Sequence, residues 1–460
     1  MVSYPRDERQ ERIGGDDVSL GRCAPPVICL DVEASEPLPH LLAPTGREAR
    51  GWPAPSAAYL LVRLHGVPVA TALVPVPPEG LQPGRLARQL WQQAGDALAR
   101  HAREDGLPVP VGLDPEGCVA ADVPLCARRR AETLAHAPHV TVVIATRERP
   151  YQLRRCLESV SRSDYPSFDV VVVDNAPETE TTSRLVSSHP WPVPLRYVRE
   201  DRRGLAAAHN RGILHSRGEI LAFTDDDVEV DRNWLSALVG GFGAGTGIVA
   251  VTGLIHPAEL RTRAQILLEQ HAGFGKGFVP TVYDLREHRP DDPLYPFAAG
   301  RLGSGANMAF DAEVLRRMGG FDPAMGTGTA AGGGDDLVAL FSVIARGYRL
   351  YYEPAAVVFH YHRDDASALV RQSFGYGVGL GAYLTNVMVH HPLMALETIA
   401  RSPGAVARAV RPGSGRNGYR YEGWPEGMAR SEIRGLLRGP AAYARSRWRS
   451  HGAERVGSDR

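Results

Sequence analysis

Three consecutive carboxylates, Asp225, Asp226 and Asp227, follow a short apolar stretch at residues 220–224. This stretch is typical of a buried strand, and open α/β sheets bind ligands beyond the carboxyl ends of their strands. Three adjacent negative charges repel one another unless a positive charge lies among them. Mg²⁺ and Mn²⁺ prefer hard oxygen ligands, usually carboxylates completed by substrate phosphates. The run therefore indicates a metal site for a phosphate-bearing ligand, and an acidic turn in solvent is the alternative at this point.

Length and composition limit the class of protein. A chain of 460 residues predicts two or three domains, and 43% apolar with 23% charged residues is ordinary for globular proteins. The formal net charge is zero, so we expect no nucleic-acid partner. The five cysteines are scattered without a CxxC pair, and no histidines lie near them at zinc-finger spacing, which favours a reducing compartment. The amino-terminal segment is charged and lacks the apolar region of a signal peptide, so we expect a cytoplasmic protein.

Residues 1–137 are predicted to form a small α+β accessory domain. Two apolar runs, 60–64 and 67–74, flank His65-Gly66 and predict a β-hairpin. Residues 86–103 have apolar side chains at helical spacing and predict an amphipathic helix. No part of this section resembles an active site, and its role stays open between acceptor binding, assembly and docking of a partner.

From Val140 the pattern changes to alternating strands and helices. Residues 140–145, 169–173, 195–198 and 220–224 predict strands, and residues 205–216 predict a helix between the last two. Such alternation is typical of an α/β fold with a doubly wound, mostly parallel sheet. Polar residues at the strand ends should meet at one edge of this sheet, so the acidic run is not isolated. These residues are Thr146, Arg147, Asp174, Asn175 and Asp225–Asp227.

A second group of polar motifs follows. Gly303–Met308 is a glycine-rich loop, and Asp311 is placed to cap a short helix that ends at Gly319. Gly332–Gly334 precede Asp335-Asp336 and permit a mobile loop that closes over a substrate. A final apolar strand at residues 350–359 leads into His360-Tyr361-His362.

Taken in order, these motifs resemble those of family 2 glycosyltransferases, which have the GT-A nucleotide-sugar-binding fold. The resemblance covers about residues 138–365, and no single motif is specific without the others. The motifs that carry it are residues 142–149, 172–175, 204–212, 225–227, 303–308, 333–336 and 360–363. It implies transfer of a sugar from a nucleoside diphosphate sugar to an acceptor hydroxyl with inversion at the anomeric carbon. A UDP-sugar is favoured by its frequency in the family, and GDP and dTDP donors stay open.

The resemblance also implies which residues bind the donor. Asp174 resembles the acid that contacts the base or ribose, and Thr146 and Arg147 resemble the loop beside the nucleobase. Arg203 and Asn210 flank the Gly204 loop and are candidates for ribose or phosphate contacts. Asp225 and Asp226 complete this donor set.

The metal would be Mn²⁺ or Mg²⁺. In an extended segment Asp225 and Asp227 point to one side and Asp226 to the other, so Asp227 is the favoured principal ligand, with Asp225 beside the ribose or the metal. His360 resembles the histidine that completes the metal shell in the family, and His362 is the alternate. An imidazole ligand favours Mn²⁺ over Mg²⁺.

Inversion needs a base on the face opposite the leaving group, which deprotonates the acceptor hydroxyl. By its position in the family pattern Asp336 is that base, and Asp335 is the alternative catalytic residue. Relatives usually have Glu where this chain has Asp335, and often an acid where it has Val338, which weakens any inference about the acceptor. Gly305 and Asn307 belong to the predicted acceptor and active-site loop.

Residues 366–460 are predicted to be a helical, arginine-rich extension. Residues 372–396 carry no formal charge, but they are too polar and too rich in glycine to predict a spanning helix. From Arg401 onward the sequence contains 13 arginines and only 5 acidic residues, and this positive charge suits an anionic membrane surface. We therefore expect peripheral contact with the inner face of the membrane and a glycan, glycolipid or small-molecule acceptor, for an envelope polysaccharide, glycolipid or secondary metabolite. The alternative is a helical appendage that packs on the transferase domain.

Two other functions compete with glycosyl transfer. A nucleotidyltransferase usually has a glycine-rich phosphate loop after its first strand, and residues 146–150 contain no glycine. A non-catalytic protein that binds nucleotide or sugar would keep the fold and stays open.

Overall fold

The computed structural model describes residues 19–42, 55–120, 122–272, 274–401 and 427–457. The chain divides into two compact units. The first contains residues 1–129, 257–273 and 362–364, and the second contains residues 130–256, 274–361 and 365–460. The expected boundaries were 137/138 and 365/366. In the structure two later segments join the amino-terminal unit, and the carboxyl-terminal helices belong to the same unit as the large sheet.

The first unit contains a three-stranded sheet in the order β1-β2-β3 and a long helix. Its elements are β1 Val27–Glu33, β2 Ala57–Leu64, β3 Val67–Pro75 and α1 Pro83–Glu104. β2 and β3 pair antiparallel, which confirms the predicted hairpin, and α1 confirms the predicted helix. Leu86, Leu90 and Leu98 of α1 are fully buried in one core with the sheet residues, because they recur on one helix face.

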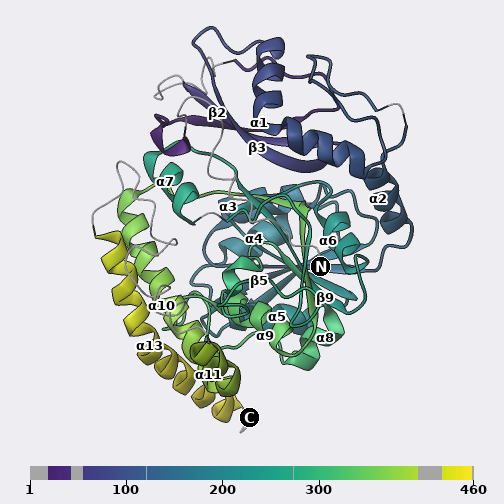
Figure 1. Ribbon diagram of the computed structural model, residues 1–460. Helices are drawn as coiled ribbons and strands as arrows, with labels where there is room; N and C mark the ends of the chain where they lie inside the picture. The colour runs from purple at the N-terminus through teal and green to yellow at the C-terminus, as the bar shows by residue number, and fades with distance from the viewer. Residues whose placement is uncertain (1–18, 43–54, 121, 273, 402–426, 458–460) are drawn as a thin grey trace. The chain divides into compact units, whose positions relative to one another are not determined.

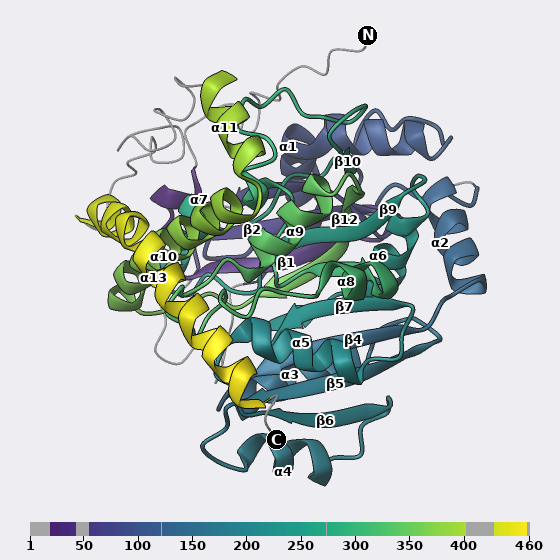
Figure 2. The same cartoon turned by 90° about the horizontal axis from the view of Figure 1, so that it is seen from below.

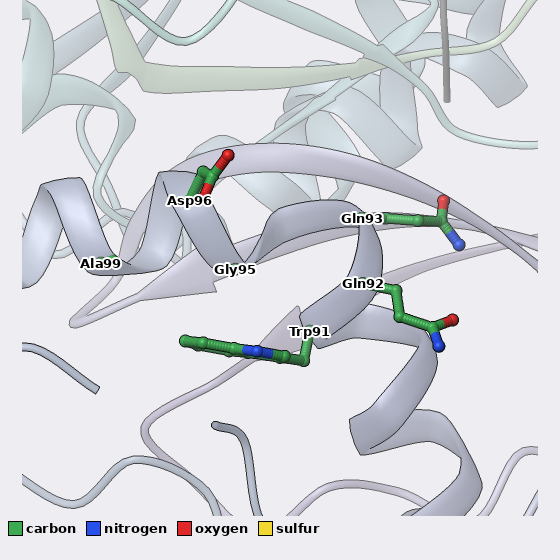
Figure 3. Close-up of a pocket in the computed structure, with 6 residues that line it drawn as sticks. All are labelled: Trp91, Gln92, Gln93, Gly95, Asp96 and Ala99. Atoms are coloured by element: carbon green, nitrogen blue, oxygen red, sulfur yellow. The ribbon is translucent and has the colours of Figure 1, made fainter. Parts of the chain in front are cut away.

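The edge of this small sheet is closed by a side chain from α1. Gln93 accepts a hydrogen bond from the Leu73 amide at 2.9 Å and donates one to the Leu73 carbonyl at 3.0 Å. Gln93 also lines a hollow made only of α1 residues, in which the Trp91 indole lies along the helix beside Gly95 (Figure 3). A Cβ atom at Gly95 would lie 3.0 Å from that indole, so any larger residue at this position would displace the ring.

Three further elements belong wholly or partly to the first unit. They are the 3₁₀ turn η2 Leu20–Arg22, α7 Arg263–Ala272, and the start of α2 Leu125–Ala135. The Val27 amide of β1 donates to the Leu260 carbonyl at 2.9 Å. The segment around residue 260 therefore extends the hydrogen bonding of the small sheet.

The second unit is built on a nine-stranded mixed sheet in the order β10-β12-β9-β11-β7-β4-β5-β6, with β8 paired to β12. The strands β7, β4, β5 and β6 are parallel neighbours, as Figure 2 shows, and β11 and β8 pair antiparallel with their partners. The α/β fold is confirmed, but the sheet is mixed and not mostly parallel. Its parallel part contains the strands predicted at 140–145, 169–173, 195–198 and 220–224, whereas the strand predicted at 350–359 is β12, which pairs antiparallel with β8 and β10. The bounds are β4 Val140–Thr146, β5 Phe168–Asn175, β6 Leu195–Glu200, β7 Ile220–Asp225, β8 Val228–Val230, β9 Ile248–Pro257, β10 Thr281–Tyr283, β11 Met308–Asp311 and β12 Arg349–His360.

Helices cover both faces of this sheet, so its central strands are apolar on both sides. Along β4, Val143 packs in one core with α5, α8 and α9, and the alternate residues Val142 and Ile144 pack in another with α3 and α6. The helices are α3 Pro150–Val160, α4 Thr181–Ser188, α5 Leu205–His215, α6 Trp234–Phe242, α8 Ala312–Met318 and α9 Asp335–Ala345, with the 3₁₀ turn η4 Ala299–Arg301. The predicted cap of α8 is present, since the Asp311 carboxylate accepts from the Val314 amide and Gly319 ends the helix in the left-handed region.

The carboxyl-terminal helices are α10 Ala366–His390, α11 Pro392–Arg401 and α13 Met428–Gly457. Helices α10 and α13 run side by side (Figure 1), and Gly377 and Gly381 of α10 face Gly435 and Gly439 of α13. A Cβ atom at Gly377 would lie 2.1 Å from the Glu432 carbonyl oxygen, so only glycine allows this approach. Among the described residues, no helix combines the length and the apolar character that crossing a membrane requires. Residues 402–426 of the arginine-rich tail lie outside the described part of the chain.

Candidate active site

The predicted site begins where three parallel strands end side by side. Strand register pairs Thr146 of β4 with Asp174 of β5, and Ala145 of β4 with Asp225 of β7. The polar residues after these strands therefore lie along one edge of the sheet, as the sequence predicts.

The acidic run turns its side chains in alternate directions. Asp226 is buried, and its carboxylate accepts a hydrogen bond from the Thr146 hydroxyl at 2.7 Å and another from Arg149 at 3.0 Å. Asp225 and Asp227 are less buried. Asp226 therefore anchors the run to the loop after β4, while its two neighbours are available to a ligand.

A histidine and an arginine lie on either side of Asp227. Its Oδ1 atom is 3.5 Å from Nε2 of His360, and its Oδ2 atom accepts from Arg149 at 3.0 Å. The histidine reaches this position because β12 pairs with β8, in a register that places His360 opposite Val228. His362 lies elsewhere, with its side chain fully buried and its Nε2 atom 2.9 Å from Glu269. The structure thus brings together Asp227 and His360, whereas the partner of His362 is Glu269.

The three carboxylates have different proton affinities. Burial, followed by the charge of Asp227, raises the pKa of Asp225 to about 7 and that of Asp226 to about 6. Burial also acts to raise the pKa of Asp227, but its hydrogen bond to His360 and the charges of His360 and Arg149 lower it to about 2. Asp227 is therefore the carboxylate of the run that is ionised most readily.

The donor set is suited to a divalent cation that also binds phosphate. Asp227 offers a carboxylate oxygen and His360 an imidazole nitrogen, and the carboxylate of Asp225 receives no hydrogen bond from any described side chain. Asp225, Asp227 and His360 do not form one of the clusters in the described residues that bring three ligand atoms within 4.8 Å of one another. A cation here would need further ligands, which matches a site completed by the phosphates of a substrate.

Asp335 and Asp336, the two candidates for the catalytic base, point in different directions. Asp336 accepts hydrogen bonds from the Gly305 amide at 2.9 Å and the Leu337 amide at 2.8 Å. Asp335 is 3% exposed, and its Oδ2 atom lies 3.3 Å from Nδ1 of His209. Burial, followed by the charge of Asp335, raises the pKa of Asp336 to about 6. Of the two, only Asp336 faces the glycine-rich loop.

The glycine-rich loop connects this pair to the acidic run. Gly305 binds Asp336, and the carbonyl of the next residue, Ala306, accepts from the Thr224 hydroxyl at 2.8 Å. Thr224 directly precedes Asp225. Short backbone links therefore hold Asp336 and the acidic run in a fixed relation.

Two residues of this site were not singled out from the sequence. Arg149 is one of four charged or polar residues in the motif at residues 142–149, and nothing in its spacing shows that it bridges Asp226 and Asp227. His209 is 1% exposed and packs against the rings of Phe223 and Phe321, so its contact with Asp335 depends on the tertiary fold. The only signal in the sequence was that both lie inside family motifs.

The predicted donor residues lie around the same edge. Asp174 is fully buried and accepts from the Tyr197 hydroxyl at 2.9 Å, and burial raises its pKa although that bond opposes the rise. Arg147 reaches the loop after β5, where it donates to the Ala176 carbonyl and pairs with Glu178. Arg203 is exposed beside Gly204.

The Gly204 loop is held by a residue at the end of β5. The Asn175 side chain accepts from the Gly204 amide at 2.9 Å and donates to the Arg202 carbonyl at 2.7 Å. Gly204 itself has φ of 142°, which favours glycine. Asn175 therefore fixes the backbone on both sides of Arg203.

Asn210 and Asn307 have structural roles in this fold. The Asn210 amide donates to the Phe321 carbonyl and accepts from the Phe321 amide, so both of its groups hold the segment after α8. Asn307 is fully buried, where it donates to the Leu254 and Ala356 carbonyls and accepts from the Trp234 indole. We therefore withdraw Asn210 as a direct contact to ribose or phosphate, because its side chain already binds protein groups; Asn307 belongs to the predicted active-site loop and supports it from the interior.

Comparison with known proteins identifies the family of one part of the chain. Residues 141–312 match the family model described as glycosyl transferase family 2. This part of the chain is a glycosyltransferase family 2 domain, and it lies in the second unit, which has a GT-A-like α/β fold with a mixed sheet. The matched segment begins in β4 and ends just after β11, so it contains the acidic run and the glycine-rich loop, and ends before Asp335.

Several curated proteins resemble this chain over part of their length. The "pre-mycofactocin glycosyltransferase" of Mycobacterium tuberculosis is 28% identical over 254 residues, which cover 55% of this chain and 48% of that protein. "Glycosyltransferase AglE" of Haloferax volcanii is 32% identical over 120 residues, which cover 25% and 39%. A solved mannosyltransferase from Pyrobaculum calidifontis, in complex with GDP-Man and Mn²⁺, aligns with a TM-score of 0.44 and 22% identity over 66% of this chain and 87% of its own. This chain spans about half the length of the mycobacterial relative.

Proposed function

We propose that the protein is an inverting, metal-dependent glycosyltransferase that moves a sugar from a nucleoside diphosphate sugar to an acceptor hydroxyl. The observation that carries this proposal is the approach of His360 to Asp227, 3.5 Å apart, at the edge where β4, β5 and β7 end. The family match supports the same class of reaction. For the donor we favour a UDP-sugar, and for the acceptor a glycan, glycolipid or small molecule.

In the proposed reaction the acceptor oxygen attacks the anomeric carbon as the bond from that carbon to the diphosphate oxygen breaks. Asp336 takes the hydroxyl proton, and the diphosphate leaves with the electron pair of the broken bond. The amides of Gly305 and Leu337 hold the carboxylate of Asp336 in place. Its raised pKa makes it a stronger base than an ordinary aspartate. Asp335 is then a positioning residue, since it faces His209 in the interior.

Asp227 and His360 would hold the cation, with Asp225 beside it or the ribose. Bound there, Mn²⁺ or Mg²⁺ would stabilise the negative charge that develops on the departing diphosphate. Five residues are proposed to bind the donor: Thr146, Arg147, Asp174, Arg203 and Asp226. Of these, Arg203 has an exposed side chain suited to phosphate. Asp226 acts indirectly, because Thr146 and Arg149 already occupy its oxygens.

A panel of UDP-, GDP- and dTDP-sugars, each with and without Mn²⁺, tests the proposal. Water can take the place of the acceptor hydroxyl and attack the anomeric carbon, which frees the nucleoside diphosphate, so we would measure release of nucleoside diphosphate by the full chain without an acceptor. Release from one donor class, with Mn²⁺ only, supports the proposal and identifies the nucleotide. Donor binding without release, and without transfer to any hydroxyl acceptor, favours a non-catalytic binding protein instead.

We propose in addition that α13 places the protein on an anionic membrane surface. Leu437 and Trp448 are 75% and 78% exposed, and they are close to three helical turns apart. Arg434, Arg438 and Arg445 of the same helix are also exposed. Apolar side chains among arginines suit the interface of an anionic bilayer.

Co-sedimentation with vesicles tests the membrane contact. Binding to phosphatidylglycerol vesicles, absent with phosphatidylcholine alone and weakened in Trp448→Ser, is the expected result. Leu214→Ser is the matched control, since Leu214 is also 75% exposed but lies on α5. Equal binding of the two variants would contradict this role of α13.

A further inference from the structure

Four side chains with metal-binding atoms meet in the amino-terminal unit, outside the site described above. They are His65, His101, Asp105 and Cys126, and their ligand atoms all lie within 4.8 Å of one another. His101 and Asp105 are one helical turn apart at the end of α1, His65 lies in the β2–β3 turn, and Cys126 lies at the start of α2. Three separate elements therefore each deliver ligands to one point.

The atoms converge on a single carboxylate oxygen. Oδ2 of Asp105 lies 2.7 Å from Nδ1 of His65, 3.2 Å from Nε2 of His101 and 3.0 Å from Sγ of Cys126. In a tetrahedral zinc site, bond lengths of 2.0–2.3 Å place neighbouring ligand atoms roughly 3.3–3.8 Å apart. Small side-chain movements would therefore admit an ion between these four atoms.

The surrounding structure holds the cluster in place. Glu33 accepts hydrogen bonds from the amides of His65 and Gly66, and His65 has φ of 57°, an uncommon conformation for a residue other than glycine. The other carboxylate oxygen of Asp105 accepts from the Cys126 amide at 2.8 Å. Such bonds orient metal ligands in known sites.

The cluster is also buried, and one of its atoms lacks a partner. The side chains of His65 and Asp105 are 6% and 4% exposed. Nε2 of His101 is buried and makes no hydrogen bond of acceptable geometry with any described residue, although it points toward Asp105. A buried polar atom without a partner is unfavourable unless something else satisfies it, and a cation would do so.

A second cluster of potential metal ligands in the described residues differs from the first in exposure and in charge compensation. Asp284, Glu287 and His288 also come within 4.8 Å, but Glu287 and His288 are exposed. Arg349 pairs with both Asp284 and Glu287, at 3.1 and 2.7 Å, and supplies the positive charge. The first cluster contains a sulfur ligand, and no arginine or lysine forms a described ion pair with its carboxylate.

We propose that His65, His101, Asp105 and Cys126 form a structural zinc site. Two neutral imidazoles, one carboxylate and one thiolate give a tetrahedral set whose charge of −2 balances Zn²⁺. The thiol would lose its proton on binding, and the proton would pass to solvent. All four positions are filled by protein, so the ion would link the hairpin, α1 and α2 and stabilise the small unit without taking part in glycosyl transfer.

The test uses the full chain, purified without chelators, and elemental analysis of bound metal. We expect about one zinc per chain, retained in Asp227→Asn, and reduced at least about tenfold in Cys126→Ser and His101→Asn. Cys118→Ser is the matched control, since Cys118 belongs to the same unit but lies outside the cluster. Zinc that is equal in Cys118→Ser and Cys126→Ser would overturn the proposal.

Cobalt substitution identifies the ligands without relying on the stability of a variant. The Co²⁺-loaded chain should show thiolate-to-cobalt charge transfer in the near ultraviolet and intense tetrahedral bands in the visible. A chelator should lower the melting temperature of the wild-type chain, and added zinc should restore it. Two results would show that the cluster is only hydrogen-bonded and binds no ion. One is a cobalt spectrum with no thiolate band, and the other is a metal-free chain whose melting temperature does not change when zinc is added.

Discussion

Oδ1 of Asp227 lies 3.5 Å from Nε2 of His360, although the two residues come from distant parts of the sequence. Strand pairing between β8 and β12 creates this approach, so the fold itself builds the pair. Arg149 occupies the other oxygen of Asp227. The proposed metal site therefore already contains one positive group that compensates the acids.

Arg149→Ala should destabilise the protein, because it leaves Asp226 and Asp227 without their arginine partner. The Arg149 side chain is 38% exposed, so solvent screens part of the pair, and we expect a loss of about 1–2 kcal/mol in the free energy of unfolding. Urea denaturation with and without Mn²⁺ measures this, and Mn²⁺ should recover more stability in the variant than in wild type. Arg154→Ala, an exposed position on α3, is the control and should change little. Equal stability of the two variants would show that Arg149 does not compensate the acidic run.

Asp336→Asn should separate binding from turnover. The asparagine keeps the size of the side chain and one acceptor for the Gly305 or Leu337 amide, but it cannot take a proton from an acceptor hydroxyl. We expect transfer to fall roughly 10²–10⁴-fold, while the Kd for nucleotide with Mn²⁺ stays within about threefold. Asp164→Asn is the control, since Asp164 is exposed and distant in sequence from the glycine-rich loop. Full activity in Asp336→Asn would remove Asp336 as the base.

The raised pKa of Asp336, about 6, predicts a pH dependence in both activity and stability. Activity needs the ionised form, so kcat/KM should fall about tenfold per pH unit below pH 6. In the folded state Asp336 holds its proton to higher pH than in the unfolded chain, so between about pH 4 and 6 stability falls as pH rises. Asp336→Asn should therefore gain about 3 kcal/mol over wild type above pH 7 and nothing at pH 4. A flat kcat/KM profile down to pH 5, or a variant equally stable at every pH, would contradict this.

Two glycines on α10 give a matched pair of substitutions. A Cβ atom at Gly377 would meet the Glu432 carbonyl of α13 at 2.1 Å, whereas a Cβ atom at Gly375 would have no atom within 4 Å. Gly377→Ala should lower the free energy of unfolding by about 1–3 kcal/mol, and Gly375→Ala should be neutral or stabilising by up to about 1 kcal/mol. Thermal denaturation of both variants measures the difference. A Gly377→Ala protein as stable as Gly375→Ala would show that α10 and α13 do not pack this closely in solution.

Local patterns were enough to predict most elements of the sheet and the position of the acidic run. β4 and β5 are continuous β-branched segments, and Asp311 and Gly319 bound α8 with ordinary capping chemistry. Alternation of side chains also placed Asp226 opposite Asp225 and Asp227. These inferences depend on neighbours within a few residues, which a sequence records directly.

Contacts between distant segments could not be predicted in the same way. The partner of the Asn210 side chain is the backbone of Phe321, more than a hundred residues away, so a polar residue in a family motif was mistaken for a ligand contact. The cluster of His65, His101, Asp105 and Cys126 shows no zinc-finger spacing, and only the one-turn interval between His101 and Asp105 hints at it. The antiparallel strand β11 inserts between β7 and β9, which made the sheet mixed.

Calorimetric titration of UDP, GDP, dTDP and CDP, with and without Mn²⁺, tests the central claim most directly. The chains to compare are wild type, Asp227→Asn, and the control His288→Ala, whose histidine lies 2.9 Å from Asp284 in an unrelated cluster. We expect Mn²⁺ to tighten binding of one nucleotide at least about tenfold, or 1.4 kcal/mol, in wild type and His288→Ala, and to have no effect in Asp227→Asn. Mn²⁺-dependent binding that survives in Asp227→Asn, or no nucleotide binding by the folded wild-type chain, would contradict the proposed active site.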